Sequence, residues 1–149
     1  MTAAFEESWL AGPGGTKFYT RIYKADQPKA VLVFLHGFAE HIGRYDHVHD
    51  KYSEKGITVF TYDARGFGKT ALDAGNKSKD SSYGKTSWKQ QFEDIEWAIG
   101  YSRKQVPGVP TFLMGHSMVC IWRVCVLFHG LLTLFGLCMH REAETFSVS

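Results

Sequence analysis

The chain has 149 residues, of which 44% are hydrophobic, 15% aromatic and 21% charged. This is a globular composition, and it excludes disordered, collagen-like and coiled-coil proteins. Seventeen basic and fifteen acidic side chains leave a net charge of +2, which is too small to indicate a surface for nucleic acid or anionic membranes. The length predicts a single domain, and we expect no nucleic-acid partner.

The amino terminus has neither a basic region nor an apolar stretch, so we expect no secretory signal. We therefore expect a cytoplasmic protein whose contact with membranes or lipid droplets is peripheral. The cysteines Cys120, Cys125 and Cys138 are odd in number, and their spacing matches no zinc or CxxC pattern. These spacings give no support for a metal site or a redox site.

Five segments have the length and composition of β-strands. In chain order they are Phe5–Leu10, Lys17–Lys24, Ala30–Leu35, Ile57–Tyr62 and Thr111–Met114. The run Ala30–Leu35 is apolar at every position, which is typical of a strand buried on both faces of a parallel sheet.

Two helices are predicted between these strands. The first ends near Gly56, and the second begins at Thr86 or Ser87, either of which can cap it. The apolar stripe of the first helix consists of Tyr45, Val48 and Tyr52. The apolar stripe of the second helix consists of Trp88, Phe92, Ile95 and Ile99. The alternation of strands and helices predicts an α/β fold.

The character of the chain changes after Met118. Residues 119–140 are apolar on every side, without turn residues or an amphipathic period. The uncharged part, Val124–Met139, has sixteen residues, whereas spanning a bilayer takes about 20, so it is marginal as a transmembrane helix. We therefore predict a folded domain over 1–118 and a separate apolar tail over 119–149.

A candidate nucleophile follows the strand Thr111–Met114. Gly115-His116-Ser117-Met118 matches four of the five positions of the nucleophile elbow G-x-S-x-G. In that motif a serine on a tight strand-to-helix turn presents its hydroxyl at the edge of the sheet. Val119 stands where the motif has its second glycine, and a branched side chain fits this crowded turn poorly. A polar turn with an unreactive serine is the alternative interpretation.

A second motif, His36-Gly37-Phe38, follows the strand Ala30–Leu35, where α/β hydrolases carry an oxyanion loop. Two backbone N–H groups about 2.7–3.1 Å from a developing oxyanion can stabilise it. The candidate donors are the amides of Phe38 and Met118, and Gly37 lets the backbone approach a substrate. His-Gly alone is an ordinary strand-end turn, but the elbow after the later strand makes the combination specific.

Three segments, in this order, resemble motifs of the monoacylglycerol lipases and their serine-aminopeptidase-type relatives. They are His36–Tyr45, similar to HG-x-x-EH-x-x-RY; Tyr62–Thr70, similar to D-x-RG-x-G-x-S with threonine for serine; and Gly115–Met118, similar to the start of GHSMGG. The resemblance implies a partial α/β-hydrolase fold with strands 1 to 5 of the central sheet. It also implies a serine hydrolase for monoacylglycerols or similar lipid esters, with Ser117 as the nucleophile and with no cofactor or metal. The loop-organising or structural positions would be His36, Gly37, Glu40, Asp63, Arg65 and Gly115.

The later part of the family's pattern does not follow Ser117. In α/β hydrolases the triad runs serine, acid, histidine along the chain. After Ser117 the histidines are His129 and His140 and the acids are Glu142 and Glu144, so no histidine follows an acid. We therefore expect the amino-terminal half of such a hydrolase, truncated after the elbow and without esterase turnover of its own.

Two alternatives stay open: a non-catalytic fragment of hydrolase ancestry, and a nucleotide-binding α/β module. Gly68-Lys69-Thr70 resembles the end of a P-loop, but Asp63 stands where that motif needs glycine, and a carboxylate there repels phosphate. Residues 66–71 approximate a dinucleotide-binding turn, but no clear helix is predicted after them. In a truncated sheet the outer edge of Thr111–Met114 would be unpaired, and we expect self-association through it.

We interpret residues 119–149 as translated intron or frameshifted sequence, because agreement with the family stops within one residue of Met118. The pair Val119-Cys120 can be encoded by GTATGT, a common form of splice donor. We expect the gene to carry a splice donor at these codons. A genomic sequence that continues in frame through an ordinary exon, without a donor there, would show the interpretation to be wrong.

Overall fold

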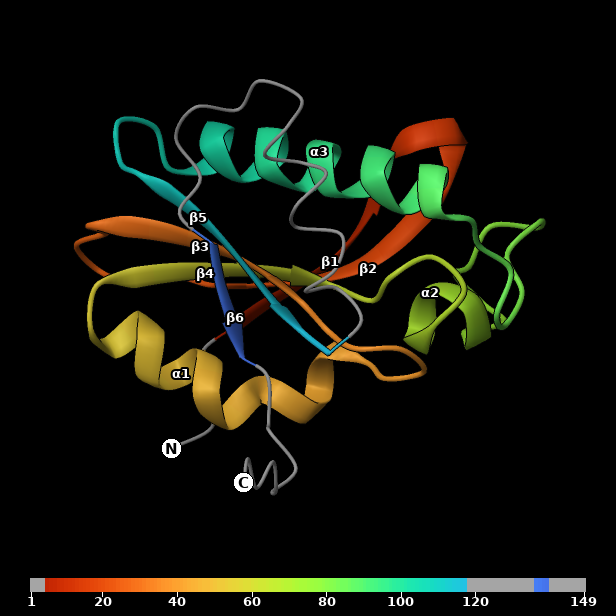
Figure 1. The fold of residues 1–149 in the computed structure, drawn as a ribbon, viewed down its shortest axis with the longest axis horizontal. Coiled ribbons are helices and arrows are strands. Elements are labelled where there is room, and N and C mark those ends of the chain that lie inside the picture. The colour runs from red at the N-terminus through yellow and green to blue at the C-terminus, as the bar shows by residue number, and fades with distance from the viewer. Residues whose placement is uncertain (1–4, 118–135, 140–149) are drawn as a thin grey trace, which may run out of the picture.

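The structure is a computed structural model that describes residues 5–117 and 136–139. Its strands are β1 (Phe5–Ala11), β2 (Lys17–Tyr23), β3 (Ala30–Leu35), β4 (Ile57–Tyr62), β5 (Thr111–His116) and β6 (Gly136–Met139). Its α-helices are α1 (Asp46–Glu54), α2 (Gly68–Leu72) and α3 (Trp88–Gln105), and short 3-10 helices cover Pro13–Gly15 and Ile42–Tyr45. The strands form one sheet in the order β1-β2-β4-β3-β5-β6 (Figure 1). The α/β fold is thereby confirmed.

Parallel pairing joins the centre of this sheet to β6, whereas β1 and β2 form an antiparallel flank. β3 lies between β4 and β5 and is parallel to both. β2 is antiparallel to β4, and β1 is antiparallel to β2. All six residues of β3 are buried, as its apolar sequence predicts for a central parallel strand.

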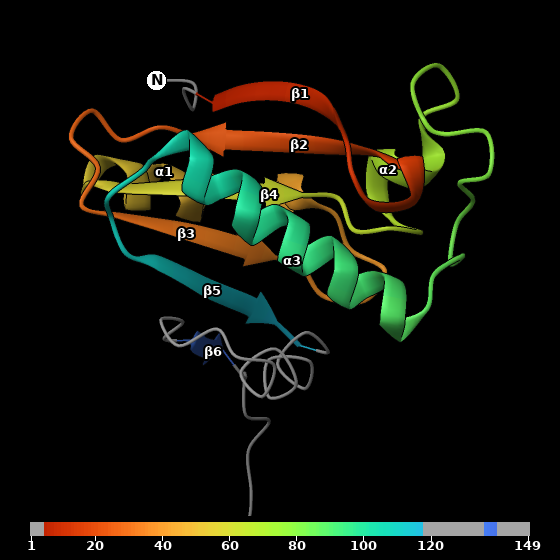
Figure 2. The same cartoon turned by 90° about the horizontal axis from the view of Figure 1, so that it is seen from above.

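Helices cover both faces of the sheet: α3 lies on one face and α1 on the other (Figures 1 and 2). Side chains alternate along β3, because successive residues of a strand point to opposite faces. Val33 and Leu35 pack in the core under α3, together with Ile95 and Ile99 of that helix. The alternate residues of β3 pack in the second core, with Tyr45 and Tyr52 at its border.

Ser87 and Trp88 lie at the start of α3. Ser87 is the N-cap of α3, and its hydroxyl accepts a hydrogen bond from the Gln90 amide at 3.3 Å, as predicted. Trp88 was predicted to share the buried stripe, but its side chain is 70% exposed. The first residue of α3 lies at the end of the helix that extends toward the preceding loop, where little of the sheet is left to cover it (Figure 2).

No helix is predicted after residues 66–71, and the described chain has none between Leu72 and α3, which confirms this prediction. The short helix α2, which was not predicted, begins at Gly68, inside that segment. This helix has five residues, which is too short to show an amphipathic period in the sequence. Phe67, at its N-cap, is buried and Leu72, at its end, is exposed. α2 is thus a short helix after β4 that follows a buried N-cap residue and ends at the surface.

The prediction of an unpaired edge at β5 is wrong. β6 pairs with β5 in parallel, from Leu113 opposite Gly136 to His116 opposite Met139. From Leu113 to His116, β5 is therefore paired on the side through which self-association was expected. Apart from β6, the tail and the marginal membrane helix predicted in it lie outside the described residues. Among the described helices, none has the length and apolarity that a bilayer crossing needs.

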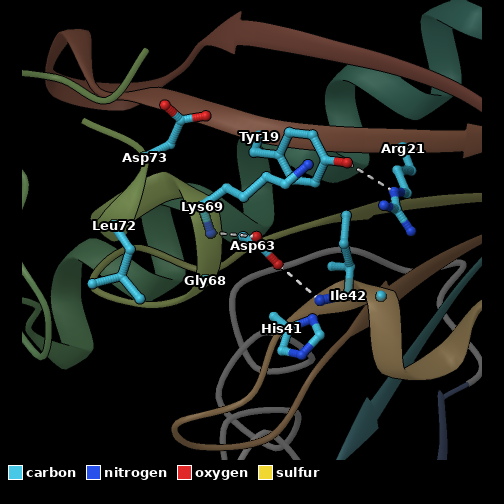
Figure 3. Close-up of a pocket in the computed structure, with 10 residues that line it drawn as sticks. Tyr19, Arg21, His41, Ile42, Asp63, Gly68, Lys69, Leu72 and Asp73 are labelled. Atoms are coloured by element: carbon cyan, nitrogen blue, oxygen red, sulfur yellow. Dashed lines mark hydrogen bonds between the residues drawn. The ribbon is translucent and has the colours of Figure 1, made fainter. Parts of the chain in front are cut away.

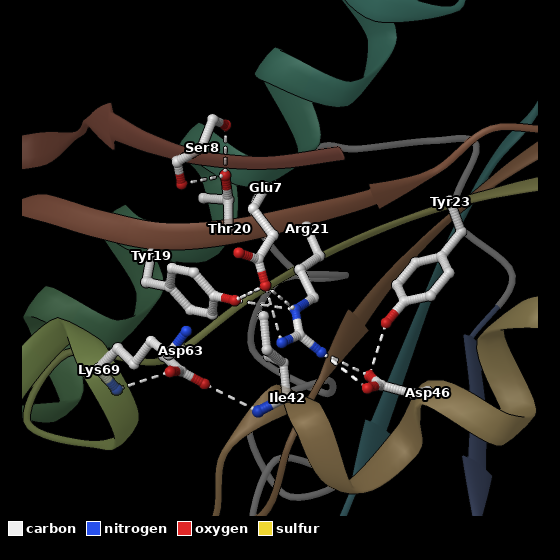
Figure 4. A network of polar contacts seen from close by, with 10 residues as sticks. All are labelled: Glu7, Ser8, Tyr19, Thr20, Arg21, Tyr23, Ile42, Asp46, Asp63 and Lys69. Carbon is white, nitrogen blue, oxygen red and sulfur yellow. Dashed lines mark hydrogen bonds and ion pairs between the residues drawn. The ribbon is translucent and has the colours of Figure 1, made fainter. Parts of the chain in front are cut away.

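A network of charges attaches the antiparallel flank to α1 (Figure 4). The Arg21 guanidinium donates through Nη1 to both carboxylate oxygens of Asp46, each at 2.8 Å, and through Nη2 to Glu7 at 2.9 Å. The Tyr23 hydroxyl donates to Asp46 Oδ1 at 2.6 Å. Burial of Tyr23, and its hydrogen bond to Asp46, raise the pKa of this phenol. One arginine on β2 therefore joins β1, β2 and the first turn of α1.

His49 is the fully buried residue of α1, although the sequence stripe did not include it. Its ring lies among those of Tyr23, Phe34 and Tyr45, with centroid distances of 5.0, 4.7 and 6.1 Å. Within the described part of the chain, neither ring nitrogen has a hydrogen-bond partner. Burial therefore lowers the pKa of His49 to about 4.

The His49 pKa predicts a loss of stability in acid. In the unfolded chain a histidine has a pKa of about 6.5, so between pH 6.5 and 4 the unfolded state binds the proton and the folded state does not. The free energy of unfolding should fall by about 3 kcal/mol over that window and be insensitive to this group above it. Urea unfolding at several pH values should show a weaker decline for His49→Leu. The variant His47→Leu, at an exposed position of the same helix, should keep the decline; an unchanged decline in His49→Leu would contradict the prediction.

Candidate active site

The parallel pairing of β3 and β5 brings the predicted oxyanion loop and the predicted elbow together. Leu35, the last residue of β3, lies opposite Gly115 of β5. Because both strands run in the same direction, the chain leaves the sheet at the same edge after each of them. His36 and Ser117 therefore begin two neighbouring turns, although 80 positions separate them in the sequence. Gly115 itself is buried within β5.

Ser117 directly follows β5 and is exposed. Its φ is +57°, in the left-handed region that residues with a Cβ rarely occupy. Such strained turns occur at functional sites when the surrounding structure holds them. The elbow motif predicts a tight turn at this position, and the role of Ser117 as nucleophile stays a prediction. Met118, the second predicted oxyanion donor, lies outside the described residues.

The loop after β3 forms a tight turn around Phe38. The Glu40 amide donates to the Gly37 carbonyl at 3.3 Å, and Ala39 has a φ of +58°. Among the described residues, Ala39 and Ser117 are the non-glycine positions with positive φ, and they lie in the two neighbouring turns that follow β3 and β5. The amide of Phe38 has no hydrogen-bond acceptor within the described part, and its side chain is 61% exposed. No pattern in the sequence indicated the strain at Ala39.

His36 is locked between two loops and is unsuited to act as a base for Ser117. Its Nε2 accepts a hydrogen bond from the Ala64 amide at 2.8 Å, which fixes the proton on Nδ1. Nδ1 lies 2.7 Å from the Gly37 carbonyl oxygen, to which it then donates. Burial lowers the pKa of His36, which keeps the ring neutral. The ring thus ties the turn after β3 to the loop after β4.

Asp63 organises the segment around it. Its Oδ1 accepts from the Ile42 amide at 2.8 Å, and its Oδ2 accepts from the Lys69 amide at 2.7 Å. Gly68 has a φ of +50°, and a Cβ there would collide with the Asp63 carboxylate. Both oxygens of this buried carboxylate are therefore committed to backbone amides, which explains why the loop needs glycine beside it.

Arg65 pairs with a partner that the motif did not reveal. Its Nε and Nη2 donate to the two carboxylate oxygens of Asp94 in α3, at 3.0 and 2.7 Å, and the Asp94 side chain is fully buried. Arg65 also donates to Thr16 and to the Pro13 carbonyl. The hydrogen bonds to Asp94 raise the pKa of Arg65. The bidentate ion pair fastens the loop after β4 to α3, and the hydrogen bonds to Thr16 and Pro13 fasten the same loop to the β1–β2 turn.

A pocket of about 540 Å³ lies beside the loop that follows β4 (Figure 3). It is lined by Tyr19, Arg21, His41, Ile42, Gly43, Asp63, Gly68, Lys69, Leu72 and Asp73. The Lys69 ammonium lies 4.1 Å from the centroid of the Tyr19 ring. Neither Ser117 nor Phe38 is among these lining residues, so the pocket is separate from the predicted nucleophile. In the described ranges no group of three or more His, Cys, Asp or Glu side chains is placed to hold a metal ion.

Comparison with known protein families shows the family to which the chain belongs. Residues 26–119 match the profile of the family described as serine aminopeptidase, S33. The chain belongs to this family. The matched segment contains the three motifs around His36, Asp63 and Ser117, so the family match covers both turns of the candidate site.

The chain is also similar to proteins named as monoacylglycerol or monoglyceride lipases. The chain is 31% identical over 119 residues to a monoacylglycerol lipase of Mycolicibacterium smegmatis, covering 79% of this chain and 40% of the relative. It is 32% identical over 111 residues to a monoglyceride lipase of Rattus norvegicus, covering 73% and 34%. The chain thus spans well under half the length of these relatives.

Solved structures show the same partial correspondence. A carboxyl esterase from Bacillus coagulans, solved with glycerol, superposes with a TM-score of 0.72 at 30% identity, over 89% of this chain and 44% of the esterase. A monoglyceride lipase from Saccharomyces cerevisiae, solved with a substrate analogue, superposes with a TM-score of 0.71 at 25% identity, over 88% and 44%. The predicted partial α/β-hydrolase fold is therefore confirmed.

Proposed function

We propose that the turns around Ser117 and Phe38 form the acyl-transfer site of a serine hydrolase that cleaves monoacylglycerols or similar lipid esters. The observation that carries this proposal is the left-handed backbone of Ser117 at the end of β5, beside a turn whose Phe38 amide has no acceptor in the described residues. The lipase relatives support a lipid ester as the substrate. Such a substrate lies in membranes or lipid droplets, so we propose a cytoplasmic protein with peripheral contact to those surfaces.

In this proposal the Ser117 hydroxyl attacks the ester carbonyl. A general base takes the hydroxyl proton as the bond between serine Oγ and the carbonyl carbon forms, and the negative charge moves to the carbonyl oxygen. The amides of Phe38 and Met118 donate to that oxygen. The alcohol then leaves with a proton, and water hydrolyses the acyl-serine. Every step uses protein groups and water, so the proposed reaction requires no cofactor.

The base is the part that the described residues do not supply. Both ring nitrogens of His36 are occupied by backbone groups, and no histidine of the described part hydrogen-bonds to Ser117. After Ser117, no histidine follows an acid in the sequence. An unactivated serine hydroxyl is a weak nucleophile. We therefore propose that the 149-residue chain, tested by itself, has no esterase turnover.

A chimera can test this proposal, because the proposal predicts a gain of hydrolysis in it. Residues 1–118 would be joined to the part of the Mycolicibacterium smegmatis monoacylglycerol lipase that begins at the fifth position of its own elbow. We expect this chimera to hydrolyse a monoacylglycerol and a p-nitrophenyl ester, and Ser117→Ala to lower the rate by at least roughly 10³-fold. The unmodified 149-residue chain should match its own Ser117→Ala variant in hydrolysis and in fluorophosphonate labelling.

Two results would contradict the proposal. A folded chimera whose hydrolysis does not depend on Ser117 would exclude this serine as the nucleophile. Labelling or hydrolysis by the 149-residue chain that disappears in Ser117→Ala would show that the chain contains a base. His129 and His140 would then be the first candidates to substitute, because they are the histidines that follow Ser117.

A further inference from the structure

We propose that Glu40 is a positioning residue whose carboxylate clamps the turn after β3 to the end of β5 and thereby directs the Phe38 amide toward Ser117. The catalytic meaning of this clamp depends on the proposed function. The clamp itself is a property of residues that the structure describes. It can therefore be tested without any measurement of hydrolysis.

The Glu40 carboxylate contacts groups from three segments. Its Oε2 accepts from the Gly37 amide at 2.9 Å and from the Tyr45 hydroxyl. The same oxygen lies 3.3 Å from Nδ1 of His116, the residue that precedes Ser117; this contact is an ion pair when the imidazole is protonated and is not a hydrogen bond. Its Oε1 pairs with Nη1 of Arg44 at 3.0 Å. Because the side chain is only 13% exposed, water competes little for these oxygens.

The three segments meet at one crowded point. A Cβ added at Gly37 would lie 3.0 Å from Glu40 Oε2 and also 3.0 Å from His116 Nδ1. The ring of Tyr45 stands beside that of His116, with 6.0 Å between their centroids. The turn after β3 and the end of β5 therefore touch through the Glu40 carboxylate, and the absence of a side chain at Gly37 makes this approach possible.

The clamp selects which amide of the turn remains free. Two consecutive N–H groups, those of Gly37 and Phe38, follow the end of β3. Glu40 takes the Gly37 N–H, whereas the Phe38 N–H has no acceptor in the part of the chain that the structure describes. The same bond helps to hold the turn in which Ala39 keeps its left-handed backbone, since such a conformation persists only when its surroundings fix it.

The charge of Glu40 suits this role. Burial opposes ionisation, but the hydrogen bonds from Tyr45 and Gly37, with the nearby His116 and Arg44, outweigh it and lower the pKa of Glu40. The carboxylate is therefore an acceptor throughout the neutral range. Hydrogen bonds to an ionised acceptor are shorter and stronger than neutral ones, which favours a rigid turn.

The test is NMR spectroscopy of the full 149-residue chain labelled with ¹⁵N. In the wild type, the Gly37 amide proton should follow an acid titration with a midpoint below 4.5, the ordinary value for glutamate. In Glu40→Gln this titration should be lost, and the amide signals of Phe38 and Ser117 should move. The control Glu54→Gln removes an exposed carboxylate at the end of α1 and should shift both signals several-fold less.

Each outcome decides the proposal. A Gly37 titration together with displaced Phe38 and Ser117 signals in Glu40→Gln would support the clamp. Unchanged Phe38 and Ser117 signals would overturn it, because Glu40 would then affect only its own turn. If Glu40→Gln does not fold, the wild-type titration alone decides: Phe38 and Ser117 must titrate together with Gly37, and their failure to do so would overturn the proposal.

Discussion

The parallel register of β3 against β5 is the constraint on which the candidate site depends. Val31 lies opposite Thr111, and the pairing continues to Leu35 opposite Gly115. Since both strands end at the same edge, two turns that are remote in sequence become neighbours. A shift of this register by one residue would turn the core side chains of β5 to the opposite face, so burial of both faces also fixes the position of Ser117.

Polar contacts then join the three sequence motifs to one another. His36, from the first motif, accepts from Ala64 in the second. Asp63, from the second, accepts from Ile42 in the first. Glu40, in the first, reaches His116 in the third. The buried polar residues of the motifs are thus occupied in bonding one loop to another, whereas Ser117 stands exposed.

The elements with a strong local signal were predictable from the sequence. The unbroken apolar run of β3 and the N-cap at Ser87 each follow from local residue chemistry, and the structure confirms both. The two turns of the candidate site were located for the same reason: each motif lies directly after an apolar strand. A family resemblance supplied the role proposed for Ser117, which residue chemistry alone leaves as a serine in a turn.

Features that depend on tertiary contacts escaped the sequence analysis. The pairing of Arg65 with Asp94 joins positions 29 apart, and nothing local distinguishes Asp94 from other acids of α3. The burial of His49 depends on rings from β2, β3 and the 3-10 helix before α1. β6 was missed because four apolar residues within a longer apolar tail carry no boundary.

The central claim is that Ser117 occupies a strained turn prepared for nucleophilic attack. Its most direct test is a measurement of backbone φ angles in the 149-residue chain, from NMR coupling constants and chemical shifts. The account predicts φ near +57° at Ser117 and near +58° at Ala39. A negative φ at Ser117 in the folded chain would contradict it, because the serine would then continue the strand rather than form the elbow.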